Sequence, residues 1–188
     1  MARLDSQRNF DFLKYMVESD DDRGLLNELM NAYGKDVWNY AYSITRKWDM
    51  ADDISQEVFI KVFRNMHAFR RDASVKTWLL TITRNTAIDF QRSAFFRKVT
   101  LSDTMEERGE RESVEHDVLA KSTVNDMWRM VLELPKKYRE VIILYAHHQL
   151  SLKEIAQVLD VTEGTIKSRM FHARQKLSKM KEANSHGG

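Results

Sequence analysis

The stretch from Ser151 to Leu177 gathers residue types that can read DNA on one face of a predicted helix. Ser151 and Glu154 form a capping-box pattern that predicts a helix start, and Thr162 can cap a second helix after a short turn. A short helix, a tight turn and a longer helix are typical of the helix-turn-helix. At roughly 100° per residue, one side of the second helix combines an aromatic ring with polar and basic side chains. That side and its edges consist of Gly164, Lys167, Ser168, Arg169, Phe171, His172, Arg174, Gln175 and Lys176.

Phe171 distinguishes two interpretations of this second helix. The opposite side carries an apolar stripe of Ile166, Met170, Ala173 and Leu177. Phe171 lies outside that stripe, so the core that the stripe forms does not explain it. A DNA-reading face explains it, because an apolar ring can contact a thymine methyl group. On such a face polar side chains hydrogen-bond base edges and flanking cations contact phosphates. The alternative is that Phe171 packs on a neighbouring helix; we favour DNA reading because caps, turn, face and charge agree.

A second candidate surface lies on the predicted helix from Ser74 to Arg92. Basic and amide side chains share an arc of about 100° on that helix, with Trp78 at its edge. The arc consists of Thr81, Arg84, Asn85, Ile88 and Arg92. Such a face can hold single-stranded nucleic acid by phosphate contacts and base stacking. Aromatic side chains are more often core residues, so core packing is the default from these residues alone.

A third candidate surface is the polar side of the helix predicted between Asp52 and Phe63. It consists of Asp53, Gln56, Glu57 and Lys61. Apolar residues occupy the other side: Ile54, Val58, Phe59, Val62 and Phe63. By itself this pattern indicates an amphipathic helix with a solvated face.

These faces require helices at defined positions, and the chain predicts an all-α protein. It has 188 residues with 6 Gly and 1 Pro, and few segments alternate with period two. Apolar spacing predicts helices at 25–46, 49–66, 74–92 and 118–133, a further helix that starts at Leu134-Pro135, and one helix on each side of the turn before Thr162. Pro135 is expected at the favoured first helical position. The predicted apolar stripes include Ala32 and Tyr145, and the helical spacing around VIILY argues against a strand there. Residues 102–117 are charged and nearly devoid of large apolar side chains, which predicts a linker. We expect two small domains, at 1–98 and 121–188, joined by an acidic linker at 99–120.

The net charge of +2 conceals alternating blocks. Residues 1–59 carry 7 basic and 12 acidic side chains, and residues 60–98 carry 9 basic and 2 acidic ones. Residues 99–120 carry 2 basic and 7 acidic side chains, and residues 121–188 carry 12 basic and 7 acidic ones. Two basic blocks separated by an acidic segment indicate two surfaces that meet a polyanion. Chance clustering on solvated helix faces would give the same pattern.

Composition argues against several other classes. Without cysteine there is no disulfide framework or thiolate zinc site. The first residues lack the apolar run of a signal peptide, and VIILYA is too short to span a bilayer, so we expect a cytoplasmic protein. No nucleophile–base pattern, metal-ligand cluster or phosphate loop supports an enzyme or a cofactor. The adjacent His147 and His148 show no metal-ligand spacing with partners, and we expect them to be core or surface residues.

With these pieces in order, the chain resembles the extracytoplasmic-function sigma factors, the two-domain minimal members of the bacterial sigma-70 family. The resemblance covers about residues 25–180. In the first part it rests on Asp53–Phe59, Phe69–Asp72, Thr77–Leu79 and Arg84–Asp89. In the second part it rests on Leu134–Val141, Ser151–Ala156 and Gly164–Arg169. Each motif alone is moderately specific, and their order and spacing together are very specific.

The resemblance implies a role for each surface. Asp53, Gln56 and Glu57 would dock on the clamp helices of the RNA polymerase largest subunit. The −10 promoter element would be captured as an opened strand by Phe69, Arg70, Lys76, Trp78, Arg84, Asn85 and Arg92. The −35 element would be read in the major groove by Lys167, Ser168, Arg169, Phe171, His172, Arg174 and Gln175. The acidic linker would thread the polymerase channel that RNA later occupies, and an anti-sigma factor is the expected inhibitor.

One departure and two rival interpretations accompany the resemblance. Many family members have Arg where this chain has His172. Arg can pair bidentately with guanine and His cannot do so in the same way, so the −35 preference does not transfer directly. The main rival is a DNA-binding regulator of the response-regulator output type, which would need a receiver or ligand-binding domain upstream. The helices before residue 98 show no β/α alternation, which counts against a receiver. The other rival, a helical enzyme, lacks a catalytic pattern.

Overall fold

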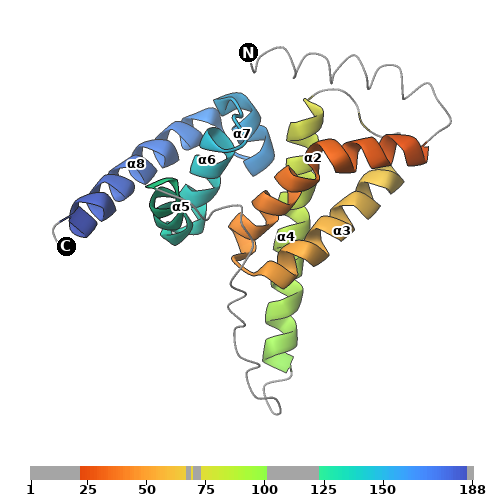
Figure 1. Ribbon diagram of the computed structural model, residues 1–188, viewed down its shortest axis with the longest axis horizontal. Helices are drawn as coiled ribbons and strands as arrows, with labels where there is room; N and C mark the ends of the chain where they lie inside the picture. Colours follow the sequence, from red (N-terminus) through yellow and green to blue (C-terminus); the bar gives the residue numbers. More distant parts are fainter. Residues whose placement is uncertain (1–21, 67–68, 70–72, 101–122, 186–188) are drawn as a thin grey trace.

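All regular elements are α-helices in the residues that the computed structural model describes, namely 22–66, 69, 73–100 and 123–185 (Figure 1). This confirms the all-α prediction. None of these helices is long and apolar enough to cross a lipid bilayer. A short helix considered for 10–18, the linker at 102–117 and the start of the helix expected at 118 lie outside the described residues.

Three helices form the first bundle: α2 (Asp22–Thr45), α3 (Trp48–Asn65) and α4 (Val75–Thr100). Their buried side chains recur three or four residues apart, which puts each set on one face of its helix. The core of this bundle includes Leu25, Leu29, Val37, Tyr40, Ile44, Ala51, Ile54, Val58, Val62, Leu79, Leu80 and Ala87. The three helices lie side by side, so the face of α3 that points away from this core is left to the surface (Figure 1).

Four helices form the second bundle: α5 (Thr123–Glu133), α6 (Lys136–Ala146), α7 (Leu152–Leu159) and α8 (Glu163–Ser185). The segment VIILY is helical, as its flanking spacing predicts. Pro135 is the residue before α6, with an extended ψ of 139°, rather than the first helical residue that we expected. The core of this bundle includes Val131, Leu134, Val141, Leu144, Ile155, Leu159, Ile166, Met170 and Ala173.

Three tight turns carry non-glycine residues in the left-handed region. Arg46 has φ 57° after α2, Gln149 has φ 58° after α6 and Asp160 has φ 52° after α7. Such a conformation costs about 1–3 kcal/mol each, and surrounding contacts must hold it. At Asp160 the following amide of Val161 donates to the Ala156 carbonyl (3.1 Å), so the turn between α7 and α8 is closed by helix-end hydrogen bonds.

Some residues of the predicted apolar stripes lie outside the core. Ala32 is exposed, Phe63 is 39% exposed and Tyr145 is 45% exposed. Ala32 and Phe63 sit at the edges of their helical stripes, whereas Tyr145 lies in the last turn of α6, which ends at Ala146. The spacing therefore predicts the centre of a buried face better than its edges and ends.

The two bundles pack against each other, α7 on α4 and α6 on α2. Figure 1 shows α6 and α7 on the side of the second bundle that faces α2 and α4. The contact includes polar groups from both sides. Glu154 at the start of α7 accepts hydrogen bonds from Thr77 (3.1 Å) and Ser74 (3.3 Å) at the start of α4. Burial alone would raise the pKa of Glu154, but its hydrogen bonds with Ser151, Thr77 and Ser74 outweigh that effect and lower it.

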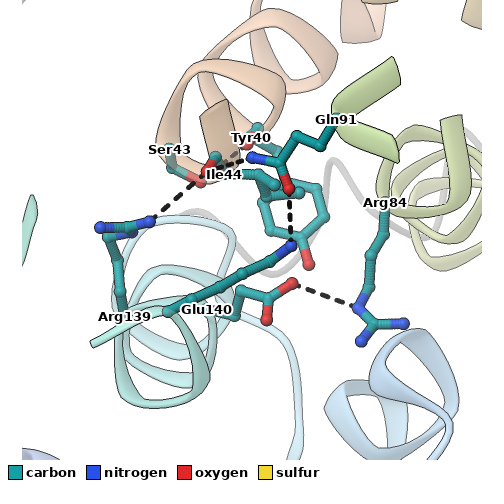
Figure 2. A network of polar contacts seen from close by, with 8 residues as sticks. Tyr40, Ser43, Ile44, Arg84, Gln91, Arg139 and Glu140 are labelled. Atoms are coloured by element: carbon teal, nitrogen blue, oxygen red, sulfur yellow. Dashed lines mark hydrogen bonds and ion pairs between the residues drawn. The ribbon is translucent and has the colours of Figure 1, made fainter. Parts of the chain in front are cut away.

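A second polar network joins α6 to α2 and α4 (Figure 2). The Arg84 guanidinium donates through Nε to the Glu140 carboxylate at 3.2 Å, and the Glu140 side chain is 4% exposed. Lys136 Nζ donates to the Gln91 side chain (3.0 Å). The Ile44 carbonyl, in the last turn of α2, accepts from Gln91 (3.3 Å) and Arg139 (3.4 Å). Helix ends leave such carbonyls without partners, so α6 helps to cap α2.

The capping box of α7 generates a stability prediction. Ser151 Oγ accepts from the Glu154 amide (3.3 Å), and the Glu154 carboxylate accepts from the Ser151 amide (2.9 Å). Ser151→Ala should destabilise the protein by about 1 kcal/mol, because one amide of the first turn loses its acceptor. Urea denaturation followed by circular dichroism measures this. Ser93→Ala, on the exposed surface of α4, is the control and should cause no loss; equal effects in both variants would contradict the capping role.

Candidate functional site

Helices α7 and α8 meet in the geometry of a helix-turn-helix. Thr162 Oγ1 accepts from the Thr165 amide at 3.2 Å, which confirms Thr162 as the cap of the second helix. The half-buried Val161 packs against the core beneath the turn. Ala156 is buried on α7, and its small side chain lets a neighbouring helix approach closely. The caps and the turn therefore fix the angle at which α8 leaves the bundle.

The outer face of α8 presents the predicted DNA-reading residues to solvent. Phe171 is 58% exposed, and its ring contacts His172 at a centroid distance of 5.5 Å. The other exposed members are Lys167, Ser168, Arg174 and Gln175, while Arg169 is half-buried. Ile166, Met170 and Ala173 are buried on the opposite side. The alternative, in which the Phe171 ring is buried against a neighbouring helix, does not agree with this exposure.

The outer face of α3 combines carboxylate and amide groups with exposed apolar side chains. Asp53 and Gln56 are exposed, and Glu57 is half-buried. Ile60 is 44% exposed and falls on the same side of the helix, next to Gln56 and Glu57. Ile60 was not among the residues predicted for this surface, although the sequence carries a signal for it. An apolar residue on the polar arc of a helical wheel is the same anomaly that singled out Phe171.

The residues predicted for single-strand contact do not form one free surface. The Phe69 and Trp78 rings pack together at 5.0 Å, and both are half-buried. Lys76 is ion-paired with Asp36 at 2.9 Å. Arg84 is engaged with Glu140 of the second bundle. Asn85 and Arg92 are exposed, and Arg70 lies outside the described residues.

One group of side chains has the composition of a metal site. Asp36 on α2 meets His147 and His148, which follow α6, with one ligand atom of each within 4.8 Å of the others. The local sequence showed no such grouping, because Asp36 and the histidines are more than a hundred residues apart. His148 is buried and His147 is exposed, as the core-or-surface expectation allows.

Comparison with known proteins decides the family. Residues 29–95 match the family model for sigma-70 region 2, and residues 125–177 match the model for sigma-70 region 4. The chain is 31% identical over 155 residues to the ECF RNA polymerase sigma factor SigM of Bacillus subtilis, covering 81% of this chain and 92% of SigM. The chain belongs to the extracytoplasmic-function sigma factors of the sigma-70 family. It binds core RNA polymerase and directs it to promoters, as sigma factors do.

Two further proteins resemble this sigma factor. The ECF RNA polymerase sigma factor SigW of Bacillus subtilis is 29% identical over 167 residues, which cover 84% of this chain and 89% of SigW. The sigma factor RpoE of Bartonella quintana, solved in complex with the anti-sigma factor NepR, shares the fold. It aligns with a TM-score of 0.65 at 24% identity, over 85% of this chain and 98% of RpoE.

The match to region 2 removes the response-regulator interpretation. It covers residues 29–95, which lie upstream of the helix-turn-helix and belong to a sigma factor domain rather than to a receiver. The described residues before 101 contain helices and no strand, which agrees with the sigma factor.

The ion pair between Arg84 and Glu140 generates a prediction about bundle contact in this sigma factor. Glu140→Gln removes the charge from a buried site while keeping the shape of the side chain, so the contact between the bundles should weaken. The closed population, meaning the fraction of molecules in which the two bundles are in contact, should fall at least threefold. The chain lacks cysteine, so cysteines introduced at the exposed Ala32 and Lys179 carry fluorophores selectively. Single-molecule energy transfer between them reports the closed population. Glu133→Gln, on the exposed end of α5, is the control; an unchanged population in Glu140→Gln would show that this ion pair does not hold the bundles together.

Proposed function

We propose that this sigma factor reads the −35 promoter element through the outer face of α8. The observation that carries the proposal is the exposure of Phe171 on the second helix of a capped helix-turn-helix. An exposed aromatic ring between Lys167 and Gln175 is suited to apolar contact with a thymine methyl group and to hydrogen bonds with base edges. His172 replaces the arginine of many family members, so a base preference other than the common consensus is expected at its contact.

The outer face of α3 is our proposed docking site for the clamp helices of the polymerase largest subunit. Asp53, Gln56 and Glu57 supply polar and acidic contacts, and the exposed side chain of Ile60 supports the proposal. An apolar side chain within a polar rim is the composition of a protein interface. A solvated face alone would not need it.

The −10 element is proposed to bind as an opened strand along the first half of α4. The participants would be Phe69, Arg70, Lys76, Trp78, Arg84, Asn85 and Arg92. Extruding a base costs about a few kcal/mol, which stacking and phosphate contacts can offset. Glu140 engages the Arg84 Nε–H across the contact between the bundles, so a phosphate group would compete with this ion pair. Promoter binding would therefore favour separation of the two bundles.

The remaining assignments follow from the sigma role. The protein would act in the cytoplasm, as a specificity subunit without a catalytic site of its own, with domains at 1–98 and 121–188 and the acidic linker at 99–120 in the polymerase channel. An anti-sigma factor would hold it inactive by covering polymerase-binding surfaces. The crystallised pairing of RpoE with NepR is the precedent for such a partner.

Reconstituted transcription tests the docking proposal. The sigma factor with core RNA polymerase should give start-site-specific transcripts from a pool of promoter fragments of the source genome. Gln56→Ala combined with Glu57→Ala should abolish these transcripts together with core binding. The matched control is Asn27→Ala combined with Glu28→Ala, which removes an amide and a carboxylate from an exposed surface of α2. A wild-type protein that forms no complex with core would overturn the proposal.

Phe171 tests the −35 assignment separately. Phe171→Ala should reduce holoenzyme binding to a cognate promoter about tenfold, comparable to the loss of one specific base contact. Its unfolding free energy should change by no more than about 0.5 kcal/mol, because the ring is largely exposed. Tyr145→Ala, an exposed aromatic on α6, is the control. Equal promoter affinity for wild type and Phe171→Ala would remove Phe171 from the reading face.

A further inference from the structure

We propose that Asp36, His147 and His148 form a binding site for one divalent transition-metal ion of the zinc, nickel and cobalt class, and that this ion joins the two bundles. Asp36 belongs to α2 in the first bundle, and both histidines follow α6 in the second. One ligand atom from each side chain lies within 4.8 Å of the other two. The set can form only when the bundles are in contact.

The backbone holds the two histidines in place. His147 is the C-cap residue of α6, and its amide donates to the Ile143 carbonyl at 3.0 Å. The His148 amide donates to the same carbonyl at 3.1 Å, and Gln149 then turns the chain with its positive φ. Both imidazoles are therefore presented by an ordered helix end, which limits the entropy lost when an ion binds.

The His148 ring is a buried polar group without a hydrogen-bond partner. The residue is 2% exposed, and neither ring nitrogen makes a hydrogen bond among the described residues. Nδ1 lies 3.3 Å from Oδ1 of Asp36, but the pair lacks hydrogen-bond geometry. An unsatisfied buried polar atom costs about 1–3 kcal/mol and calls for a specific explanation such as a bound ion. A metal ion between His148 and Asp36 would give the His148 ring the partner that it lacks.

The protonation states suit metal binding. Burial lowers the pKa of His148 and outweighs the raising effect of Asp36. Burial also lowers the pKa of His147. For Asp36, burial alone would raise the pKa, but His148 and Lys76 together lower it to about 2. Metal ions bind the neutral imidazole and the ionised carboxylate, and the directions of these shifts favour those forms.

Lys76 is the main competitor for the carboxylate. Its Nζ lies 2.9 Å from Oδ2 of Asp36, whereas His148 faces Oδ1. The two oxygens can therefore serve the ammonium group and an ion at the same time. Repulsion between the two cations lowers the metal affinity, so a neutral residue in place of Lys76 should strengthen binding. A purely structural role of the histidines predicts no such effect.

The donor set determines the class of ion. One carboxylate oxygen and two imidazole nitrogens suit zinc, nickel or cobalt better than magnesium or calcium, which prefer oxygen ligands. Bonds of about 2.0 Å in a tetrahedral site place ligand atoms about 3.3 Å apart. The ligands must therefore approach by about 1 Å or more when an ion binds. The exposed His147, whose Nε2 lies 3.2 Å from the Asn39 amide nitrogen, would exchange that contact for the ion.

Metal binding is tested on the isolated full-length chain. After chelator treatment, titration with Co²⁺ should produce visible absorption bands that saturate at one ion per chain, and Zn²⁺ should displace the cobalt. His147→Ala and Asp36→Asn should each weaken binding at least tenfold, and Lys76→Gln should strengthen it severalfold. His172→Ala, a histidine outside the cluster, is the control. No saturable binding, or equal affinity in His147→Ala, would overturn the proposal.

The joining role needs a second readout. In the protein labelled at Ala32 and Lys179, stoichiometric Zn²⁺ should raise the closed population severalfold, and His147→Ala should remove this response. Binding that leaves the energy transfer unchanged would overturn the joining role. An expected inhibition of transcription by Zn²⁺ rests on the proposed function. The binding and energy-transfer measurements use no polymerase, so the metal site can fail or succeed independently of the sigma assignments.

Discussion

The contact between the two bundles depends on buried polar groups, each of which is paired with a group of the other bundle. Glu140 is almost fully buried, and Arg84 of the other bundle supplies its counter-charge. Arg139, also buried, donates to a carbonyl at the end of α2. Removing one member of such a set leaves the other unsatisfied in a low-dielectric place. When the contact opens, the two bundles are therefore expected to separate fully, so that water hydrates the polar groups. A partly opened interface would leave those groups buried without partners.

This arrangement gives Arg84 two competing partners. In the closed protein Arg84 pairs with Glu140 across the bundle contact, whereas Lys76 pairs with Asp36 within the first bundle. In the proposed promoter complex both cations would contact phosphate groups. Glu140 engages the Arg84 Nε–H, so phosphate binding by Arg84 would compete with the bundle contact. Any ligand that binds only the closed form shifts this balance by mass action.

Exposed apolar side chains are informative in this protein because they lie within polar faces. Phe171 on α8 and Ile60 on α3 are each surrounded by side chains that prefer water. The core does not need them, since the opposite face of each helix already supplies it. Their free-energy gain comes only when another surface covers them. In our proposal the two residues mark the surfaces that this sigma factor presents to DNA and to polymerase.

Local physics determined most of the helical organisation from the sequence. The spacing of apolar residues predicted each helix, the Ser151–Glu154 pattern predicted the start of α7, and the wheel position of Phe171 predicted its exposure. These features depend on residues a few positions apart, which the chain itself encodes. Spacing did not determine the edges and ends of the buried faces: Phe63 at an edge and Tyr145 in a last helical turn proved exposed. Only the tertiary structure decided that Arg84 pairs with Glu140 and that Asp36 meets His147 and His148. Those partners are separated by 56 residues in the first case and by more than a hundred in the second. Their proximity arises from the packing of α6 and α7 on α2 and α4, for which no short-range pattern exists.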